Sequence, residues 1–163
     1  MIRKSKLIAL MAESLPNLSS QKKLLYRTTL AEVVELYHTI NDEIFDNKLP
    51  IPEIQVVPRC RQYWGYCFAK EPEPIHKTES NCILRLSDKW YCKQWLITIL
   101  AHEMCHQYQW DIDSHERLKY GHEPLMSHGP SFFKYKAKLA NVGISLRRAH
   151  GNSAWFKHQN LFK

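Results

Sequence analysis

The sequence lacks an apolar run near the roughly 18 residues that a membrane-spanning helix needs, so we expect no membrane partner. Its first twelve residues imitate a secretory signal, because three cations precede an apolar stretch. That stretch has only six residues and then meets Glu13, which is too short for a signal peptide. We therefore expect a protein that is not secreted.

Cysteine pairs at metal-binding or redox spacing are also missing. The five cysteines, at positions 60, 67, 82, 92 and 105, form no C-x-x-C pair and are odd in number. A disulfide framework or a zinc ribbon is built from such pairs. The pattern favours reduced thiols in the cytoplasm. With 163 residues and no internal repeat, the chain is large enough for one domain with its own core.

Acidic residues are absent from the last fifth of the chain. Residues 1–130 hold 16 Lys and Arg and 16 Asp and Glu, whereas residues 131–163 hold seven Lys and Arg and no acid. The net charge of +7 therefore lies entirely in this last segment. A localised basic segment is typical of a protein with a polyanionic partner, although a basic tail can also serve solubility alone.

The spacing of apolar residues predicts an α+β fold. We expect three helices, over residues 21–46, 89–110 and 131–140. We expect three short strands that suggest a small antiparallel sheet, over residues 52–58, 61–69 and 81–87. Polar loops are expected over residues 1–20, 71–80 and 111–127. Gly65 would be a bulge or a point of close approach, Ser87 or Asp88 would cap the second helix, and Gly143 would end the third.

The second helix contains the pattern H-E-x-x-H. On a helix, His102 and His106 lie one turn apart on the same face, with Cβ atoms about 6 Å apart. That spacing lets two imidazoles bind one zinc ion. Glu103, rotated about 100° around the helix, is badly placed as a ligand but can take a proton from a water at the metal. The alternative is a helix with two solvated histidines.

Apolar residues ahead of the motif favour the metal. Trp95, Leu96, Ile99 and Leu100 form the stripe of a buried helix face, and the two histidines continue that stripe. Burying two unpaired imidazoles is costly. A bound metal therefore explains the pair better than two core histidines.

A third ligand must come from the chain after the motif, because a catalytic zinc usually takes three protein ligands and leaves a fourth position for water. The candidates are His115, Glu116, His122, Glu123 and His128. Spacing alone does not choose among them. We favour His128, because it precedes a Gly-Pro turn that opens a helix and its backbone is therefore held.

Four blocks of sequence follow one another in order. They are Asn41-Asp42-Glu43-Ile44-Phe45 with Lys48-Leu49-Pro50, the strand Cys82-Ile83-Leu84-Arg85-Leu86-Ser87, the H-E-x-x-H stretch, and His128-Gly129-Pro130-Ser131-Phe132. In this order, over roughly residues 28–146, the sequence resembles the SprT-like zinc metalloprotease family. That family includes the Spartan-type proteases that act on DNA–protein crosslinks.

The resemblance implies a small zincin-like core, in which a mainly antiparallel three-stranded sheet packs on the long first helix and on the H-E-x-x-H helix. It implies that His102, His106 and His128 bind one catalytic Zn²⁺ and that Glu103 is the catalytic base. The activity it implies is a zinc-dependent endopeptidase with a protein substrate and with DNA as a partner.

The C-terminal part departs from the family. Many members carry a zinc ribbon of paired cysteines after the protease core, and here no cysteine follows. The basic tail would then bind DNA through Arg147, Arg148, Trp155 and Lys157, with single-stranded DNA favoured because bases stack on aromatic side chains. The alternative is that Trp155 and Phe156 dock the tail on the core.

These inferences divide the chain into an N-terminal segment, a metalloprotease domain and a basic tail, over residues 1–20, 21–146 and 147–163. We expect cleavage of DNA-bound or DNA-crosslinked proteins, in the cytoplasm or at a nucleoid or nucleus. Two alternatives stay open, a non-catalytic zinc-containing adaptor for nucleic acid and a zinc peptidase unrelated to DNA. The residue that assists the oxyanion also stays open among Tyr63, Tyr108 and His122.

Overall fold

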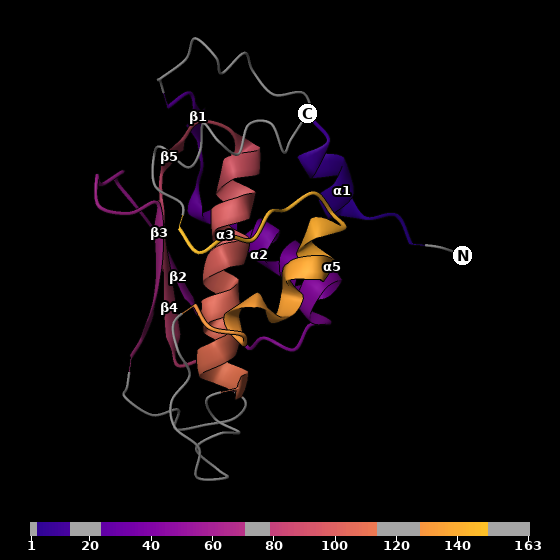
Figure 1. The fold of residues 1–163 in the computed structure, drawn as a ribbon. Coiled ribbons are helices and arrows are strands. Elements are labelled where there is room, and N and C mark those ends of the chain that lie inside the picture. Colours follow the sequence, from indigo (N-terminus) through magenta and orange to yellow (C-terminus); the bar gives the residue numbers. More distant parts are fainter. Residues whose placement is uncertain (1–2, 14–23, 71–78, 114–127, 150–163) are drawn as a thin grey trace.

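A three-stranded sheet stands at one side of the structure, and the helices lie together on one of its faces (Figure 1). The computed structural model describes residues 3–13, 24–70, 79–113 and 128–149. The strands of this sheet are β2 (Glu53–Val57), β3 (Gly65–Ala69) and β4 (Cys82–Ser87). The α+β class and the existence of the three expected strands are confirmed, but the strand expected over residues 61–69 begins only at Gly65.

The strand order is β2-β4-β3, so the last of the three strands lies in the middle. β4 runs antiparallel to β3 and parallel to β2, with Leu84 opposite both Cys67 and Ile54. The sheet is therefore mixed, and the expectation of a mainly antiparallel sheet was wrong. The apolar pattern of a strand specifies which face is buried and carries no information on the direction of its neighbour.

A second, two-stranded ladder changes where both long helices begin. β1 (Tyr26–Arg27) pairs antiparallel with β5 (Lys89–Trp90). Helix α2 therefore runs from Leu30 to Phe45 rather than from residue 21, and Thr29 caps it by accepting a hydrogen bond from the Glu32 N–H at 3.2 Å. The expected helix start was wrong because pairing between distant residues displaced a locally favourable helical pattern.

The start of the H-E-x-x-H helix also differs from the prediction. Helix α3 spans Lys93–Tyr108, with Cys92 at the N-cap position. Ser87 and Asp88 do not cap it, because the Ser87 hydroxyl donates to the Trp64 carbonyl and the Asp88 carboxylate accepts from the Arg59 N–H. Both side chains instead fasten the end of β4 to the segment between β2 and β3.

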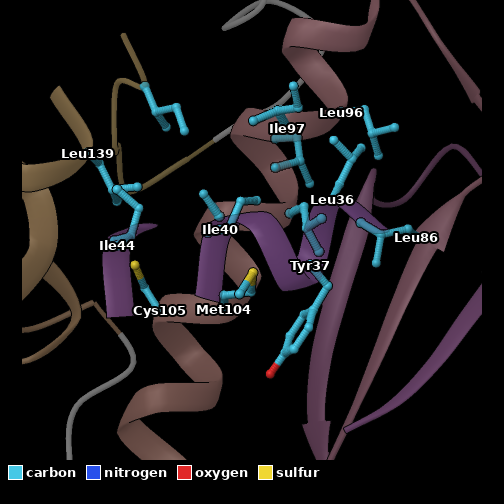
Figure 2. Close-up of a cluster of buried hydrophobic side chains, with 14 of the residues drawn as sticks. Leu36, Tyr37, Ile40, Ile44, Leu86, Leu96, Ile97, Met104, Cys105 and Leu139 are labelled. Atoms are coloured by element: carbon cyan, nitrogen blue, oxygen red, sulfur yellow. The ribbon is translucent and has the colours of Figure 1, made fainter. Parts of the chain in front are cut away.

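Helix α3 lies at the centre of the structure, with the sheet on one side and the C-terminal helix α5 on the other, while α2 contacts both α3 and β2 (Figure 1). Of its 16 residues, 14 are buried, so the single buried stripe expected from Trp95 to His106 was too narrow. A helix enclosed on all sides is buried around its whole circumference. Figure 2 shows where α2 meets it, with Ile40 and Ile44 facing Met104 and Cys105.

Beyond Tyr108 the helix widens into a π-helical turn, Gln109–Asp113. The buried Asp111 carboxylate accepts from the Ser80 hydroxyl at 2.7 Å and from the Asn81 N–H at 2.9 Å, and so anchors the start of β4. Gln107 joins this network, because its amide donates to Asp111 and to the Pro50 carbonyl and accepts from the Tyr37 hydroxyl. The expected loop over 111–127 thus begins as helix, and residues 114–127 lie outside the described part.

The first sequence block, around the end of α2, is explained by structure rather than chemistry. Asn41 is buried and pairs with both backbone groups of Leu49, at 3.0 and 3.2 Å, which fixes the turn into β2. The Glu43 carboxylate accepts from the N–H groups of Lys6 and Leu7. These belong to helix α1 (Lys6–Met11), which occupies part of the expected 1–20 loop and corrects it.

We expect Asn41→Ala to lower the free energy of unfolding by about 2–3 kcal/mol, because the substitution leaves a buried N–H and a buried carbonyl of Leu49 unpaired. Chemical denaturation at a fixed zinc concentration measures this loss. His38→Ala, at an exposed position of the same helix, is the control and should change stability by less than about 0.5 kcal/mol. Equal stabilities for the two variants would contradict the role given to Asn41.

The C-terminal described segment closes over α3. A 3₁₀ turn η2 (Phe132–Tyr135) leads into α5 (Lys136–Ala140), which agrees with the expected helix over 131–140. Gly143 then takes a left-handed conformation with φ 91°, as its predicted helix-ending role requires. Ile144 and Leu146 are buried, and the chain crosses α3 toward β3 (Figure 1).

No helix within the described ranges has both the length and the apolar character needed to cross a membrane. The N-terminal segment packs on the core through Leu7 and Met11, both of which are buried. The division of the chain at residues 20 and 146 stays a prediction.

Candidate metal centre

Three histidines meet where the C-terminal segment approaches α3. His102 and His106 come from successive turns of α3, and His128 precedes the η2 turn. One nitrogen of each ring lies within 4.8 Å of one nitrogen of the other two. Three imidazole nitrogens at this separation can hold one metal ion.

Two of the rings are oriented by hydrogen bonds on the nitrogen that would face away from a metal. The Nδ1 of His102 lies 3.1 Å from the carbonyl oxygen of Arg147, and the Nδ1 of His106 lies 3.0 Å from the Oε1 of Gln109. An Nδ1–H that donates to these oxygens leaves Nε2 with its lone pair for a ligand bond.

The environment of the third ring, that of His128, indicates whether these residues fit a bound metal. The Nε2 of His128 is buried and has no hydrogen-bond partner among the described residues. A buried polar atom without a partner is costly. A metal ion shared with His102 and His106 would satisfy it, so the donor set fits a bound metal.

The imidazoles of His106 and His128 are held in the neutral form that binds metal. Burial lowers the pKa of His106 to about 4, against the opposing effect of the Gln109 hydrogen bond. Burial also lowers the pKa of His128, and the nearby charge of Arg148 lowers it further. Both rings therefore keep a free lone pair at neutral pH.

A buried aromatic ring packs against all three histidines. Phe132 is fully buried, and its ring centroid lies 4.5 to 4.8 Å from those of all three histidines. Beside it, the Ser131 hydroxyl accepts from the Gln109 amide at 2.8 Å, and Gln109 in turn holds His106. The block from His128 to Phe132 therefore positions one candidate ligand, supports all three and orients a second.

Glu103 lies beside the cluster in a dry site. Its side chain is almost completely buried, and its Oε1 is 4.0 Å from the Nε2 of His102. Burial raises the pKa of Glu103 to about 8, while a hydrogen bond from the backbone of Cys67 on β3 acts in the opposite direction. A carboxyl group with its pKa near neutrality is matched to proton transfer.

The absence of a side chain at Gly65, at the start of β3, leaves space for the Glu103 side chain. A Cβ on this residue would lie 2.9 Å from the Cδ1 of Leu86, 3.0 Å from the Cγ2 of Ile99 and 3.3 Å from the Cγ of Glu103. The close approach expected at Gly65 is therefore found, and it occurs where the strand passes the candidate base.

We expect Gly65→Ala to destabilise the fold by about 1–3 kcal/mol, because the added methyl group overpacks the contact between β3 and α3. Any peptidase activity should fall together with stability, since Glu103 must move. Thermal unfolding and a cleavage assay on the same samples measure the two effects. Tyr66→Phe, on the other face of the strand, is the control, and an unfolding midpoint for Gly65→Ala equal to that of the control would contradict the steric argument.

A cleft of about 430 Å³ opens beside the cluster. The lining of the cleft comes from α3, from His128, from the start of β3 and the segment before it, and from the C-terminal segment. The lining residues are Arg59, Arg61, Gln62, Tyr63, Trp64, Gly65, Ile99, His102, Glu103, His128 and Arg148. The cleft thus gives access from outside to Glu103, His102 and His128.

The model of the SprT-like family matches residues 33–150. The chain belongs to the SprT-like family. A search of curated proteins found no match. Family membership and the histidine cluster together indicate a metallopeptidase.

Several residues of this SprT-like site could not be found in the sequence beforehand. Gln109 and the Arg147 carbonyl hold the two α3 histidines, and Arg59 and Arg61 line the cleft. None belongs to a recognisable motif. Gln109 lies three residues after His106, and that spacing, which brings a side chain back over the preceding turn of a helix, was the only available signal.

The structure distinguishes two of the residues that were candidates to assist the oxyanion. Tyr63 lines the cleft, whereas Tyr108 is buried with its ring stacked on Phe45 at 5.9 Å and does not line it. Other predicted residues lie outside the described part of the chain; they are His115, Glu116, His122, Glu123, Trp155, Phe156 and Lys157. Arg147 and Arg148 are described and exposed, at the edge of the site.

Proposed function

We propose that the protein is a zinc-dependent endopeptidase that acts on DNA-bound or DNA-crosslinked proteins. The observation that carries the proposal is the buried, unpartnered Nε2 of His128 within reach of His102 and His106. In the proposal these three residues hold one Zn²⁺, which three nitrogen ligands and an open position suit. Glu103 is the catalytic base.

Bound zinc would act as a Lewis acid toward the scissile carbonyl and lower the pKa of water. Glu103 accepts the proton of the attacking water at its carboxylate and later delivers it to the nitrogen of the departing amine. The backbone hydrogen bond from Cys67 fixes the orientation of this carboxylate. Its burial excludes the bulk water that would otherwise compete for the proton.

The open edge of β3 is the proposed binding surface for an extended peptide. The Ser87 N–H donates to Trp64 and the Lys70 N–H donates to Asn81, so the even-numbered residues of β3 direct their backbone groups toward β4. The odd-numbered residues Gly65, Cys67 and Ala69 direct theirs to the opposite edge, which pairs with no other described strand. The Cys67 backbone already donates to Glu103 there, so Gly65 and Ala69 supply the backbone groups proposed to bind a substrate. A substrate strand added there would pass directly over Glu103.

The DNA part of the proposal rests on charge. The acid-free segment 131–163 begins beside the site, and the Arg147 carbonyl contacts His102. We assign DNA contacts to Arg147, Arg148, Trp155 and Lys157, with single-stranded DNA favoured. DNA held by this segment would bring a DNA-bound protein close to the cleft and raise its effective concentration.

We place this activity in the cytoplasm or at a nucleoid or nucleus, where the buried thiols of Cys82, Cys92 and Cys105 stay reduced. The alternatives are a non-catalytic zinc-containing adaptor and a zinc peptidase unrelated to DNA. The burial of a carboxylate beside the histidines argues against the adaptor, because a purely structural site has no use for it.

A cleavage assay tests the proposal. Zinc-loaded protein is incubated with an unfolded protein substrate, and with the same substrate crosslinked to a single-stranded oligonucleotide. Cleavage should require zinc, stop after chelation and return when zinc is added. The crosslinked substrate should be cut at least about tenfold faster, since the second binding contact becomes intramolecular.

The DNA part of the proposal is tested with a truncated chain that keeps the metal site intact. Removing residues 147–163 would also remove the Arg147 carbonyl that holds His102. A chain that ends after Ala149 avoids this loss. Equal cleavage of both substrates by the full chain and by the truncated chain would reject the DNA part and leave a zinc peptidase. Absence of cleavage with zinc bound would favour the adaptor.

A further inference from the structure

The cleft beside the histidines has an unbalanced charge. Three arginines line it, Arg59, Arg61 and Arg148, against a single carboxylate, that of Glu103. In the proposed reaction that carboxylate is occupied with proton transfer. The described wall therefore offers a substrate positive charge and no second acid to neutralise it.

Arg59 belongs to the wall itself. Its guanidinium lies 3.8 Å from the centroid of the Trp64 ring and donates to the Tyr63 carbonyl at 2.8 Å. Its backbone N–H donates to Asp88. Partial burial lowers the pKa of Arg59, yet a guanidinium stays charged at neutral pH. Arg59 thus supplies a fixed positive potential and is not available to reach a substrate.

Arg61 and Arg148 line the cleft from two different segments of the chain. Arg61 comes from the segment that leads into β3, and Arg148 comes from the C-terminal segment beside His128. Both are exposed, and neither makes an ion pair or a hydrogen bond with another described residue. Two guanidinium groups that share a cleft with Glu103 and have no partner among the described residues are suited to bidentate binding of carboxylates.

We infer that Arg61 and Arg148 form a subsite for acidic side chains of the substrate, on residues close to the scissile bond. This role replaces the DNA contact assigned to Arg148 above and leaves Arg147, Trp155 and Lys157 as the residues proposed to contact DNA. The inference rests on the proposed peptidase function and adds its substrate class. A low-dielectric cleft focuses the field of its charges, so the preference should exceed that of arginines on an open surface.

A carboxylate suits this cleft better than a nucleic-acid phosphate does. The volume of about 430 Å³ is that of a pocket for a few side chains, whereas a B-DNA duplex is too wide to enter. A single strand that entered would place its continuous negative charge next to Glu103. An acidic side chain on a peptide places one charge at the arginines and leaves the neutral peptide bond at Glu103.

Matched peptides test the inference without DNA. A peptide that the zinc-loaded protein cuts is found by mass spectrometry, and each residue within three positions of the cut is replaced in turn by Glu, Gln and Lys. The Glu peptide should have a kcat/KM about fivefold above that of the Gln peptide at one or more positions, in the range of a partly exposed ion pair. The Lys peptide should be the poorest.

Variants then show which arginine causes the preference for the Glu peptide. Arg61→Gln and Arg148→Gln should each reduce the ratio between the Glu and Gln peptides, and the double variant should bring it to about one. Arg61→Glu should favour the Lys peptide at the position that Arg61 reads. Arg27→Gln, which removes an exposed charge on β1 away from the cleft, is the matched control and should keep the full ratio. Zinc content is measured for every variant, so that a damaged site is recognised.

The possible outcomes distinguish failure of this inference from failure of the proposed peptidase function on which it rests. If the zinc-loaded protein cuts no peptide, both fail. If it cuts peptides with equal rates for Glu, Gln and Lys at every position, the inference fails and the peptidase stands. If that charge preference is absent and a 12-nucleotide single strand inhibits the wild type but not the double variant, the arginines bind phosphate, which also overturns the inference.

Discussion

Glu103→Gln should abolish peptide cleavage and leave the metal in place. Glu103 is the only carboxylate that lines the described cleft, and its Oε1 lies 4.0 Å from the Nε2 of His102. An amide of the same size cannot accept the proton of the attacking water, and loss of a general base costs up to about 10⁴-fold in rate. We expect kcat to fall by about 10³-fold or more, with zinc content unchanged. A cleavage assay and metal analysis on the same preparation measure both.

The stability of this variant gives a second, independent result. A buried carboxylate is costly, whereas a neutral amide of equal size still accepts the hydrogen bond from the Cys67 backbone. After chelation, the Gln variant should therefore unfold at the same temperature as the wild type or at a higher one. Lower activity together with undiminished stability is typical of a functional residue.

Glu35→Gln is the control for both measurements, because Glu35 is an exposed acid of α2. It should change neither cleavage nor the unfolding temperature. Retention of more than a tenth of the wild-type rate by Glu103→Gln would remove Glu103 from the reaction. The proposal would then have to find another base, and no second carboxylate lines the described cleft.

The part of the site that the sequence could predict is the part set by local geometry. His102, Glu103 and His106 occupy a single helix, so their relative positions follow from 3.6 residues per turn alone. The structure brings the two imidazoles together with a third ring, as expected. His128 could be favoured beforehand only because its backbone precedes a turn and because its block resembles a family motif.

The groups that complete the site are positioned by contacts between distant residues. The carbonyl oxygen of Arg147 reaches His102 across 45 residues of sequence. A backbone carbonyl has no side-chain identity, so no sequence pattern could have indicated it. The arginines of the cleft are similar, since a charge in a loop is usually solvated and only the fold shows which charges share a cavity.

The errors in the fold have the same cause. Residues 26–27 and 89–90 fit helical patterns locally, and they become strands because they pair with each other. β2 and β4 are neighbours and run parallel although β3 lies between them in the sequence. Both features are decided by pairing partners far away in sequence, whereas periodicity reports only the environment of one segment.

His128→Ala should remove the metal and with it the activity. His128 is the only one of the three histidines that does not belong to α3, and its Nε2 has no other partner among the described residues. Loss of one of three ligands should weaken zinc binding by more than the roughly 10–100-fold that follows loss of an outer partner of a ligand. We expect bound zinc to fall from about one equivalent to near zero after dialysis, and cleavage to fall below detection.

Zinc should also stop stabilising the variant. A metal that binds only the folded state stabilises it by about 2.7 kcal/mol at a hundred times its Kd. Added zinc should therefore raise the unfolding temperature of the wild type and leave that of His128→Ala unchanged. Because the His128 ring also packs 4.8 Å from Phe132, His128→Gln serves as a second variant that keeps more of this contact.

His38→Ala, at an exposed position of α2, should keep both the metal and its stabilising effect, because its ring is remote from the cluster. The same dialysis applied to His115→Ala, Glu116→Ala, His122→Ala and Glu123→Ala decides between His128 and the alternatives left open by spacing. If His128→Ala and His128→Gln retain zinc while one of these loses it, the third ligand lies in the 114–127 segment. The unpartnered Nε2 of His128 would then require a different explanation, because a buried ring nitrogen without a partner destabilises the fold that contains it.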